Sequence, residues 1–290
     1  MPELPEVEVL RSHLSRRLPG LRVSSIQVLK PRITRPAHEA DLARALVGAT
    51  FDAVLRRGKN LVLQLHHPDG REAWMHAHLG MTGRIVLDDA NRALPPHAAV
   101  VLGLGSSRCI LVDPRQFGRV ALGQPHGLGP EPLDDAFGPS DLARALGESN
   151  QPIKARLLDQ SVVAGIGNIY ANEALHVARL RPGRPTSGLR HEEVLRLHAA
   201  IQQVLSRAVA LGSSLALDFE NGSDGLFYFG ASPSAPASPS ATGAVTRGVV
   251  DPEPWAVYDR ARQPCRRCGQ PIRRFMMGGR STFECRGCQR

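Results

Sequence analysis

The first six residues hold an unusual set of reactive groups. Removal of Met1 would leave Pro2 as a free secondary amine close to the carboxylates of Glu3 and Glu6. An α-amino group has a pKa of about 7.7–8.0, against about 10.4 for lysine, so this amine would be substantially unprotonated at neutral pH. Its attack on a carbon of carbonyl character would give an iminium, whose positive charge withdraws electrons. The alternative interpretation is structural, because Pro5 also suits the first turn of a helix.

Lysine is scarce in this chain. Only Lys30, Lys59 and Lys154 occur among 36 Lys and Arg residues. Lysine can transfer a proton near neutral pH and arginine cannot, so each lysine is a candidate for a role beyond plain positive charge. Chance survival of three lysines is the competing explanation.

Four of the five cysteines form two Cys-x-x-Cys pairs near the C-terminus. The pairs are Cys265 with Cys268 and Cys285 with Cys288, a pattern that predicts one tetrahedral Cys₄ zinc site with knuckle turns. Gly269 and Gly287 follow the pattern of such turns, and we expect both to have positive φ. Two disulfides or an iron–sulfur cluster are the alternatives. A zinc ion with four protein ligands has no open position and is structural. The fifth cysteine, Cys109, is expected in a buried strand.

The cysteine segment is also strongly basic. Residues 265–290 contain seven arginines and one acidic residue, which leaves about four positive charges after four thiolates and one Zn²⁺ are counted. A small basic zinc module is suited to gripping the phosphate backbone of a nucleic acid. Arg280 is predicted near a hairpin turn, where its side chain could project outward.

The whole chain agrees with a polyanionic partner. Its 290 residues carry a formal net charge of +9 and a sequence pI of about 10.0. Such a charge favours nucleic acid, although a basic protein without such a partner is the competing interpretation. The sequence has no run of eighteen apolar residues and no signal-peptide pattern at its start, so we expect a cytoplasmic protein without a membrane segment.

These groups require elements that hold them. Residues 1–130 are predicted to form a β-sandwich with one helix over residues 6–18. Residues 131–229, after a linker over 127–139, are predicted to be helical, and residues 230–252 form a disordered Ala/Ser/Pro-rich insert. Residues 253–290 hold the cysteine module. The predicted strands are 23–28, 53–55, 61–65, 84–87, 98–104 and 110–112, and the predicted helices of the second part are 140–146, 152–158, 168–176 and 191–210.

Five motifs in order resemble bacterial formamidopyrimidine-DNA glycosylases. They are Pro2-Glu3-Leu4-Pro5-Glu6-Val7-Glu8, His78-Leu79-Gly80-Met81, Asp113-Pro114-Arg115-Gln116-Phe117-Gly118, Gly165-Ile166-Gly167-Asn168-Ile169-Tyr170-Ala171 and the four-cysteine hairpin. The resemblance implies an α+β fold with an N-terminal β-sandwich and helix, a helix-two-turn-helix domain and a C-terminal zinc β-hairpin finger. It implies a bifunctional repair enzyme that excises 8-oxoguanine and ring-opened purines and then cleaves the abasic strand by β,δ-elimination.

The resemblance also assigns catalytic roles by matching position. It implies that Pro2 is the nucleophile at the sugar C1′ and that Glu3 protonates the sugar ring oxygen, with Glu6 assisting nearby. Lys59 matches the family lysine that serves β-elimination, and Arg280 matches the arginine assigned to δ-elimination. A target base must first leave the duplex, and the iminium then acidifies the sugar C2′–H.

A second set of positions matches the family's DNA contacts. Met81, Arg115 and Phe117 match the three residues that fill the space left by the flipped base, and Arg115 also reads the opposite cytosine. Without the motifs, Met81 and Phe117 would be interpreted as core residues, but their glycine-flanked loops favour exposure. The matched phosphate contacts are His78, His97, Lys154 and Asn168, with Gly165 and Gly167 letting backbone N–H groups approach the DNA.

Two departures from the family pattern concern lesion preference. Gln116 stands where the family often has a second arginine, and residues 212–215 replace a Gly-Gly-Thr-Thr-Leu pattern that approaches the damaged base. Two other functions compete. An endonuclease VIII-like glycosylase would remove oxidised pyrimidines with the same amine and zinc hairpin, but Leu4, Met81 and Phe117 favour the purine enzyme. A non-catalytic zinc-finger DNA-binding protein would not need Pro2 or Lys59.

The combined expectation is a monomeric enzyme of the bacterial cytoplasm. Its partner is double-stranded DNA with damaged bases, which would keep it at the nucleoid, and its one cofactor is a structural Zn²⁺.

Overall fold

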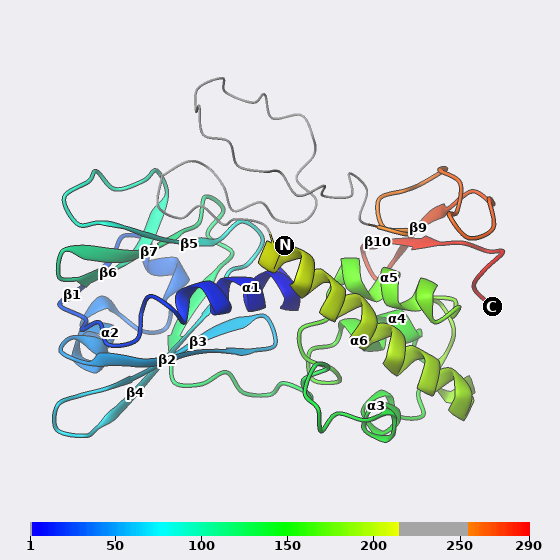
Figure 1. Ribbon diagram of the computed structural model, residues 1–290, viewed down its shortest axis with the longest axis horizontal. Helices are drawn as coiled ribbons and strands as arrows, with labels where there is room; N and C mark the ends of the chain where they lie inside the picture. Colours follow the sequence, from blue (N-terminus) through cyan, green and yellow to red (C-terminus); the bar gives the residue numbers. More distant parts are fainter. Residues whose placement is uncertain (1, 215–254) are drawn as a thin grey trace.

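The computed structural model describes residues 2–214 and 255–290, and Figure 1 shows two bodies joined side by side along the long axis. Met1, Leu215 at the end of the 212–215 segment, and the insert predicted over 230–252 lie outside the described residues. No helix in the described ranges is long and apolar enough to cross a membrane.

The first body is the predicted sandwich with its helix. One antiparallel sheet has the strand order β1-β6-β7-β5 and the other β2-β3-β4-β8. Helix α1 packs on the second sheet, with Val7, Leu10 and Leu14 in the buried core beside Leu61 and Leu63. Its elements are α1 (Leu4–Leu14), β1 (Ser25–Val28), α2 (Glu39–Leu46), β2 (Thr50–Arg57), β3 (Asn60–His66), β4 (Glu72–His78), β5 (Arg84–Asp89), β6 (Ala98–Leu104), β7 (Ser107–Val112) and β8 (Arg119–Leu122).

Several boundaries differ from the sequence prediction. Helix α1 begins at Leu4, two residues earlier than predicted, because the Glu6 carboxylate caps the N–H of Glu3. Strand β4 was missed because only Ala73, Met75 and Ala77 face the core, while its other face carries Trp and His. Strand β8 and helix α2 were missed as well. Cys109 lies buried in β7, as predicted.

The second body is helical, as predicted. Its helices are α3 (Pro139–Leu146), α4 (Ile153–Leu158), α5 (Asn168–Val177) and α6 (His191–Ser214). Helix α6 extends past the predicted end at Ala210 and runs through Gly212, a residue that a helix tolerates at a modest entropic cost. Leu4 belongs to the core of this body although it starts α1, and α1 packs on α6. The chain's N-terminus is therefore held between the two bodies (Figure 1).

The last part is a small hairpin module at the edge of the helical body (Figure 1). Strands β9 (Arg273–Met277) and β10 (Arg280–Glu284) form a two-stranded antiparallel sheet, and Val257, Ile272 and Phe283 pack with buried cysteines beneath it. The backbone N–H of Phe283 donates to Asn172 Oδ1 on α5 at 2.9 Å. This bond ties the hairpin to the helical body.

Candidate active site and nucleic-acid interface

The Glu3 carboxylate lies at the N-terminus of α5, where backbone N–H groups have no partner within the helix. Its Oε1 accepts from the N–H of Ile169 at 3.0 Å, and its Oε2 accepts from the N–H of Tyr170 at 3.4 Å. The side chain is 1% exposed. Burial raises the pKa of Glu3 to about 7, although the nearby Lys59 ammonium opposes this shift. A carboxyl with this pKa can hold a proton at neutral pH.

Two glycines make room for the N-terminus. A Cβ on Gly167 would lie 2.2 Å from Cδ of Glu3, and one on Gly165 would lie 2.6 Å from Leu4 Cδ1. The N–H of Gly165 donates to Gln160 Oε1 at 3.0 Å. The Gly165 N–H is thus used within the loop and the glycine makes room for Leu4, while the approach of backbone N–H groups of this segment to DNA stays a prediction.

Glu6 connects α1 to α5. Its Oε2 accepts from the N–H of Glu3 at 2.8 Å, and its Oε1 accepts from the hydroxyl of Tyr170 at 2.6 Å. Burial raises the pKa of Glu6. The two bonds fix the chain start, with buried Pro2 next to Glu3, against the helix that receives the Glu3 carboxylate.

Lys59 and Arg280 reach the same region from two other elements. Lys59 follows Gly58, which has φ +58° in the turn between β2 and β3, and its side chain is 7% exposed. Burial lowers the pKa of Lys59, and the Arg280 guanidinium lowers it further, whereas Glu3 raises it. Arg280 is exposed at the start of β10. Side chains from α1, the β2–β3 turn and the hairpin thus influence one another's charge.

Met81, Arg115 and Phe117 lie on two exposed loops. Met81 is 44% exposed and Phe117 is 47% exposed, as expected of side chains on projecting loops rather than in a core. The guanidinium carbon of Arg115 lies 4.6 Å from the centroid of the Phe117 ring, within cation–π range.

The two histidines predicted at phosphates have different surroundings. His78, at the end of β4, is partly buried, and its Nδ1 accepts from the N–H of Gly80 at 3.1 Å. Burial and then the Lys59 charge lower the pKa of His78. His97 is exposed with φ +64°, and its carbonyl accepts from the N–H of Asp113 at 3.1 Å.

Lys154 and Asn168 both contact the hairpin. Lys154 Nζ donates to the Ser281 carbonyl at 3.0 Å and to Thr282 Oγ1 at 2.8 Å, and Asn168 Nδ2 donates to the same Ser281 carbonyl at 3.0 Å. Burial lowers the pKa of Lys154 to about 8, assisted by the Arg280 charge. Both side chains join the helical body to β10, and their phosphate contacts stay predictions.

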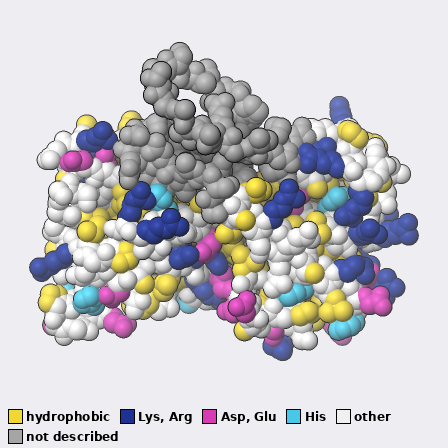
Figure 2. Space-filling view, in the orientation of Figure 1, with side chains coloured by type: hydrophobic (Ala, Val, Ile, Leu, Met, Phe, Trp, Pro, Cys, Tyr) yellow, Lys and Arg dark blue, Asp and Glu magenta, His cyan; other side chains and the backbone are white. Residues whose placement is uncertain are grey.

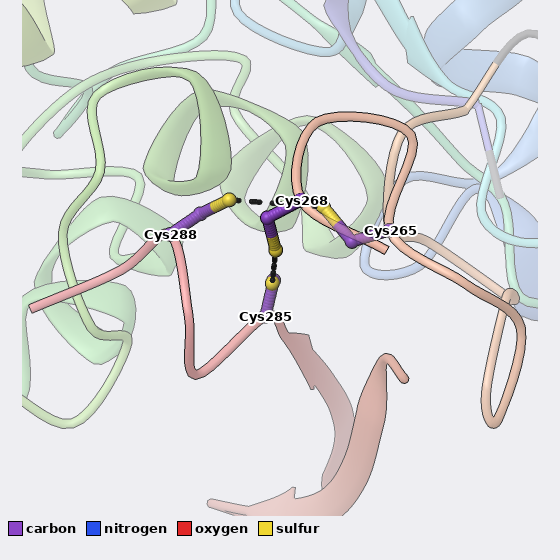
Figure 3. Close-up of side chains that lie close together, drawn as sticks. All are labelled: Cys265, Cys268, Cys285 and Cys288. Carbon is purple, nitrogen blue, oxygen red and sulfur yellow. Dashed lines mark hydrogen bonds between the residues drawn. The ribbon is translucent and has the colours of Figure 1, made fainter. Parts of the chain in front are cut away.

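The four C-terminal cysteines converge on one point (Figure 3). Their Sγ atoms all lie within 4.8 Å of one another, with Cys265 to Cys288 at 3.7 Å and Cys268 to Cys285 at 3.3 Å. Tetrahedral zinc with bonds of about 2.3 Å places its sulfurs ~3.8 Å apart. The cluster therefore fits one Zn²⁺ that holds the two knuckles together. Other groups of three or more His, Cys, Asp or Glu with metal-ligand spacing are absent from the described residues.

The two knuckle glycines serve different purposes. Gly269 has φ +75°, as predicted. Gly287 does not have positive φ, so that expectation is wrong for it. A Cβ on Gly287 would instead lie 2.7 Å from Gln270 Oε1 and 3.1 Å from Cys268 Sγ. Close approach to the first knuckle is what requires glycine there.

Sequence reasoning missed several residues that support these groups. Tyr170 binds Glu6, Ser281 receives both Lys154 and Asn168, and His176 Nε2 lies 3.6 Å from Cys265 Sγ. Tyr170 stands inside a quoted motif and could have been found there. Ser281 and His176 act across more than eighty residues, and nothing in the local sequence marks them.

Basic side chains gather around the hairpin. Figure 2 shows Lys and Arg side chains concentrated on the right of the view, over the helical body and the cysteine module. These are the basic residues that the sequence analysis predicts to bind a polyanionic partner.

Comparisons with known proteins agree with this geometry. Residues 1–120 match the formamidopyrimidine-DNA glycosylase N-terminal domain, and residues 128–219 match the formamidopyrimidine-DNA glycosylase H2TH domain. A formamidopyrimidine-DNA glycosylase of Sphingopyxis alaskensis is 38% identical over the full length of both chains.

The chain is also similar to solved structures of Fpg and MutM bound to damaged DNA. Lactococcus lactis Fpg in complex with a Fapy-dG containing DNA has a TM-score of 0.79 and 28% identity over 99% of each chain. MutM in complex with carbocyclic 8-oxo-G containing DNA has a TM-score of 0.79 and 28% identity over 100% of each chain.

Proposed function

Because this chain belongs to the formamidopyrimidine-DNA glycosylase family, we propose that it excises 8-oxoguanine and formamidopyrimidines from duplex DNA and then cleaves the abasic strand. One observation supports this most directly. The Pro2–Glu3 terminus is seated at the start of α5, within electrostatic reach of Lys59, and Lys59 is in turn within electrostatic reach of Arg280. A full-length relative is named a formamidopyrimidine-DNA glycosylase, and two solved relatives hold Fapy-dG and 8-oxo-G DNA, which favours the purine enzyme. A Lactococcus lactis Fpg structure also holds an oxidised-pyrimidine DNA, so turnover of both lesion classes has to be compared.

Base release is the first step. With Met1 removed, the neutral Pro2 amine attacks the sugar C1′ and the glycosidic bond breaks; the base leaves with the bonding electrons and takes up the proton that the amine nitrogen loses. Glu3 gives a proton to the ring oxygen, the ring opens, and the nitrogen becomes an iminium carbon–nitrogen double bond. Because the pKa of Glu3 is raised to about 7, a substantial fraction of its carboxyl is protonated near neutral pH and can give this proton. Glu6 holds the start of α1 in place.

Strand cleavage is the second step. The iminium acidifies the C2′–H, and Lys59 is the base that removes this proton as the 3′ phosphate leaves. Its burial and lowered pKa increase the unprotonated fraction. Arg280, on the hairpin, then assists δ-elimination of the 5′ phosphate by neutralising its charge.

DNA binding is divided between the parts of the chain. Residues 1–130 carry the nucleophile, the acid and Lys59, and the hairpin adds Arg280; Met81, Arg115 and Phe117 fill the space of the flipped base, and Arg115 reads the opposite cytosine. Residues 131–229 and the finger over 253–290 grip phosphates with Lys154, Asn168 and neighbouring donors, joined by His78 and His97 from the first body. One Zn²⁺ on the four cysteines holds the finger's fold. We propose that the enzyme acts as a monomer on duplex DNA in the bacterial cytoplasm, at the nucleoid.

Reductive trapping tests the proposal. Borohydride added during turnover of a duplex with one 8-oxoguanine should give a covalent adduct, and mass spectrometry should place the sugar on Pro2. Pro2→Gly should remove this crosslink, while Pro139→Ala, at the first turn of α3, should leave it intact. A crosslink on a lysine, or turnover by protein that retains Met1, would contradict the proposal.

A further inference from the structure

We propose that Asp113 is a positioning residue that joins the two DNA-entering loops into one unit, and that Thr82 is its link to the Met81 loop. The proposal rests on the proposed function, in which Met81, Arg115 and Phe117 enter the base stack. It assigns a role in opposite-base discrimination to two residues that have none in the proposed function.

The Asp113 carboxylate bonds to both loops. Oδ1 accepts from the Thr82 hydroxyl at 2.8 Å and from the N–H of Arg115 at 3.2 Å. Oδ2 accepts from the N–H of Gly118 at 2.7 Å. Asp113 is 1% exposed, so these three donors replace the water that a carboxylate would otherwise bind. One buried anion thus fixes the backbone on each side of Phe117 and the residue after Met81.

The backbones of the two loops also touch. Gly80 has φ +62°, and a Cβ there would lie 2.4 Å from the Phe117 carbonyl carbon. The first loop is tight, since the N–H of Gly83 donates to the Leu79 carbonyl at 2.8 Å. Because the Met81 loop is short and its backbone packs on the Phe117 loop, we expect the two loops to move together.

The same residue reaches a third segment. The N–H of Asp113 donates to the His97 carbonyl at 3.1 Å, where His97 has φ +64°. An exposed residue in this conformation needs an external bond to hold it. Asp113 therefore organises the loop of His97 as well as the two wedge loops.

The consequence concerns specificity. Arg115 reads the opposite base only if its backbone is fixed while Met81 and Phe117 occupy the vacated space. Loosening the link between the loops leaves Met81 and Phe117 inserted a smaller fraction of the time and lets Arg115 sample other positions. Discrimination between cytosine and adenine opposite the lesion should then fall more than the chemistry at the sugar.

Thr82 provides the sharpest test. Thr82→Val removes the hydroxyl and keeps the side-chain shape, whereas Thr82→Ser keeps the hydroxyl. The ratio of kcat/KM for 8-oxoguanine opposite cytosine over adenine should fall about fivefold in Thr82→Val and stay near wild type in Thr82→Ser. Asp113→Asn should lower the ratio further, because one donor then faces an amide NH₂, and exposed Asp69→Asn is its matched control.

A second readout separates positioning from loss of fold. With 2-aminopurine beside the orphan base and saturating protein, the fluorescence change on wedge insertion should shrink in Thr82→Val and not in Thr82→Ser. Borohydride trapping on preformed abasic DNA, which needs no opposite-base reading, measures the proposed covalent chemistry in each variant. It therefore tests the proposed function separately from the inference about Thr82. An unchanged ratio in Thr82→Val, or equal losses in Thr82→Val and Thr82→Ser, would overturn the inference. If Asp113→Asn does not fold, the Thr82 pair decides alone.

Discussion

Glu3 shows how one residue's surroundings can set its chemistry. Two backbone N–H groups and the Lys59 ammonium favour its charged form, yet burial has the larger effect and raises its pKa to about 7. The carboxyl can therefore act as an acid near neutral pH, where an ordinary glutamate is fully ionised.

The pKa of Glu3 predicts the pH dependence of base release. Because the proposed role of Glu3 requires its protonated carboxyl, the single-turnover rate of 8-oxoguanine excision should fall as pH rises through about 7. Glu3→Gln should remove this limb and slow excision by about 10²–10⁴-fold. Rates measured by strand cleavage after alkali, with preformed abasic DNA as the control substrate, check this. A limb of the same midpoint in Glu3→Gln would assign the titration to another group.

His176 is the residue-scale support of the zinc site. Its Nε2 lies 3.6 Å from Cys265 Sγ, a distance suited to an N–H···S bond that stabilises a metal-bound thiolate. His176→Phe keeps the size and removes the donor, so zinc affinity should fall about 10–100-fold in chelator competition. His198→Phe is the control. His198 is a buried histidine of α6 that is hydrogen-bonded to the Phe137 carbonyl and has no contact with the cysteines among those the structure gives. Equal zinc loss in both variants would indicate general destabilisation instead.

At the scale of elements, α5 is the anchor of the site. Its N-terminus receives Glu3, Tyr170 in its first turn binds Glu6, and Asn168 at its start contacts the Ser281 carbonyl. A rigid helix therefore aligns the chain start with the hairpin. The same helix provides His176 near its end.

The absence of a side chain on Gly167 lets Glu3 lie close to the start of α5. In Gly167→Ala the new Cβ would lie 2.2 Å from Glu3 Cδ, so the carboxyl must move by an ångström or more. A misplacement of that size costs on the order of 100-fold in rate, and we expect excision to fall accordingly. Gly188→Ala is the matched control, since a Cβ there meets nothing within 4 Å. Full activity of Gly167→Ala would mean that Glu3 does not act from this position.

The elements also show what sequence could predict. Periodic apolar residues indicated the sandwich, α5 and the start of α6, and the cysteine spacing indicated the metal site. Strand β4 was missed because its outward face carries His and Trp. Gly287 was singled out for the wrong reason, since a Cβ there would meet Gln270 and its φ is not positive. The joint contact of Lys154 and Asn168 with Ser281 spans more than a hundred residues, so only the fold could show it.

At the scale of the whole molecule, a charge network joins the two bodies at the β2–β3 turn that carries Lys59. Glu131, in the connection between them, accepts from the N–H of Gly58 at 2.6 Å and from Arg57 Nη1 at 2.8 Å through Oε1. Its Oε2 accepts from Arg56 Nη1 at 2.5 Å, and Arg56 Nε also donates to Glu8 of α1 at 2.9 Å. The turn that these bonds hold is the one that presents Lys59.

Glu131→Gln tests this network. The amide keeps the size but loses the charge and one acceptor, so Arg56 and Arg57 lose their shared partner. The side chains are 10–32% exposed, which places the loss of unfolding free energy at about 2 kcal/mol, below that of a fully buried pair. Exposed Glu148→Gln should change little, and thermal or urea unfolding measures both.

The same variant separates position from stability. Since the Glu131 bonds fix the β2–β3 turn, Glu131→Gln should slow β-elimination on preformed abasic DNA, the step proposed for Lys59, more than it slows release of 8-oxoguanine, the step proposed for Pro2 and Glu3. Quench-flow measurement of both steps well below the melting temperature gives the two ratios. Equal slowing of both steps would show that the network contributes stability alone, whereas selective loss of elimination would show that contact between the bodies sets the position of the base.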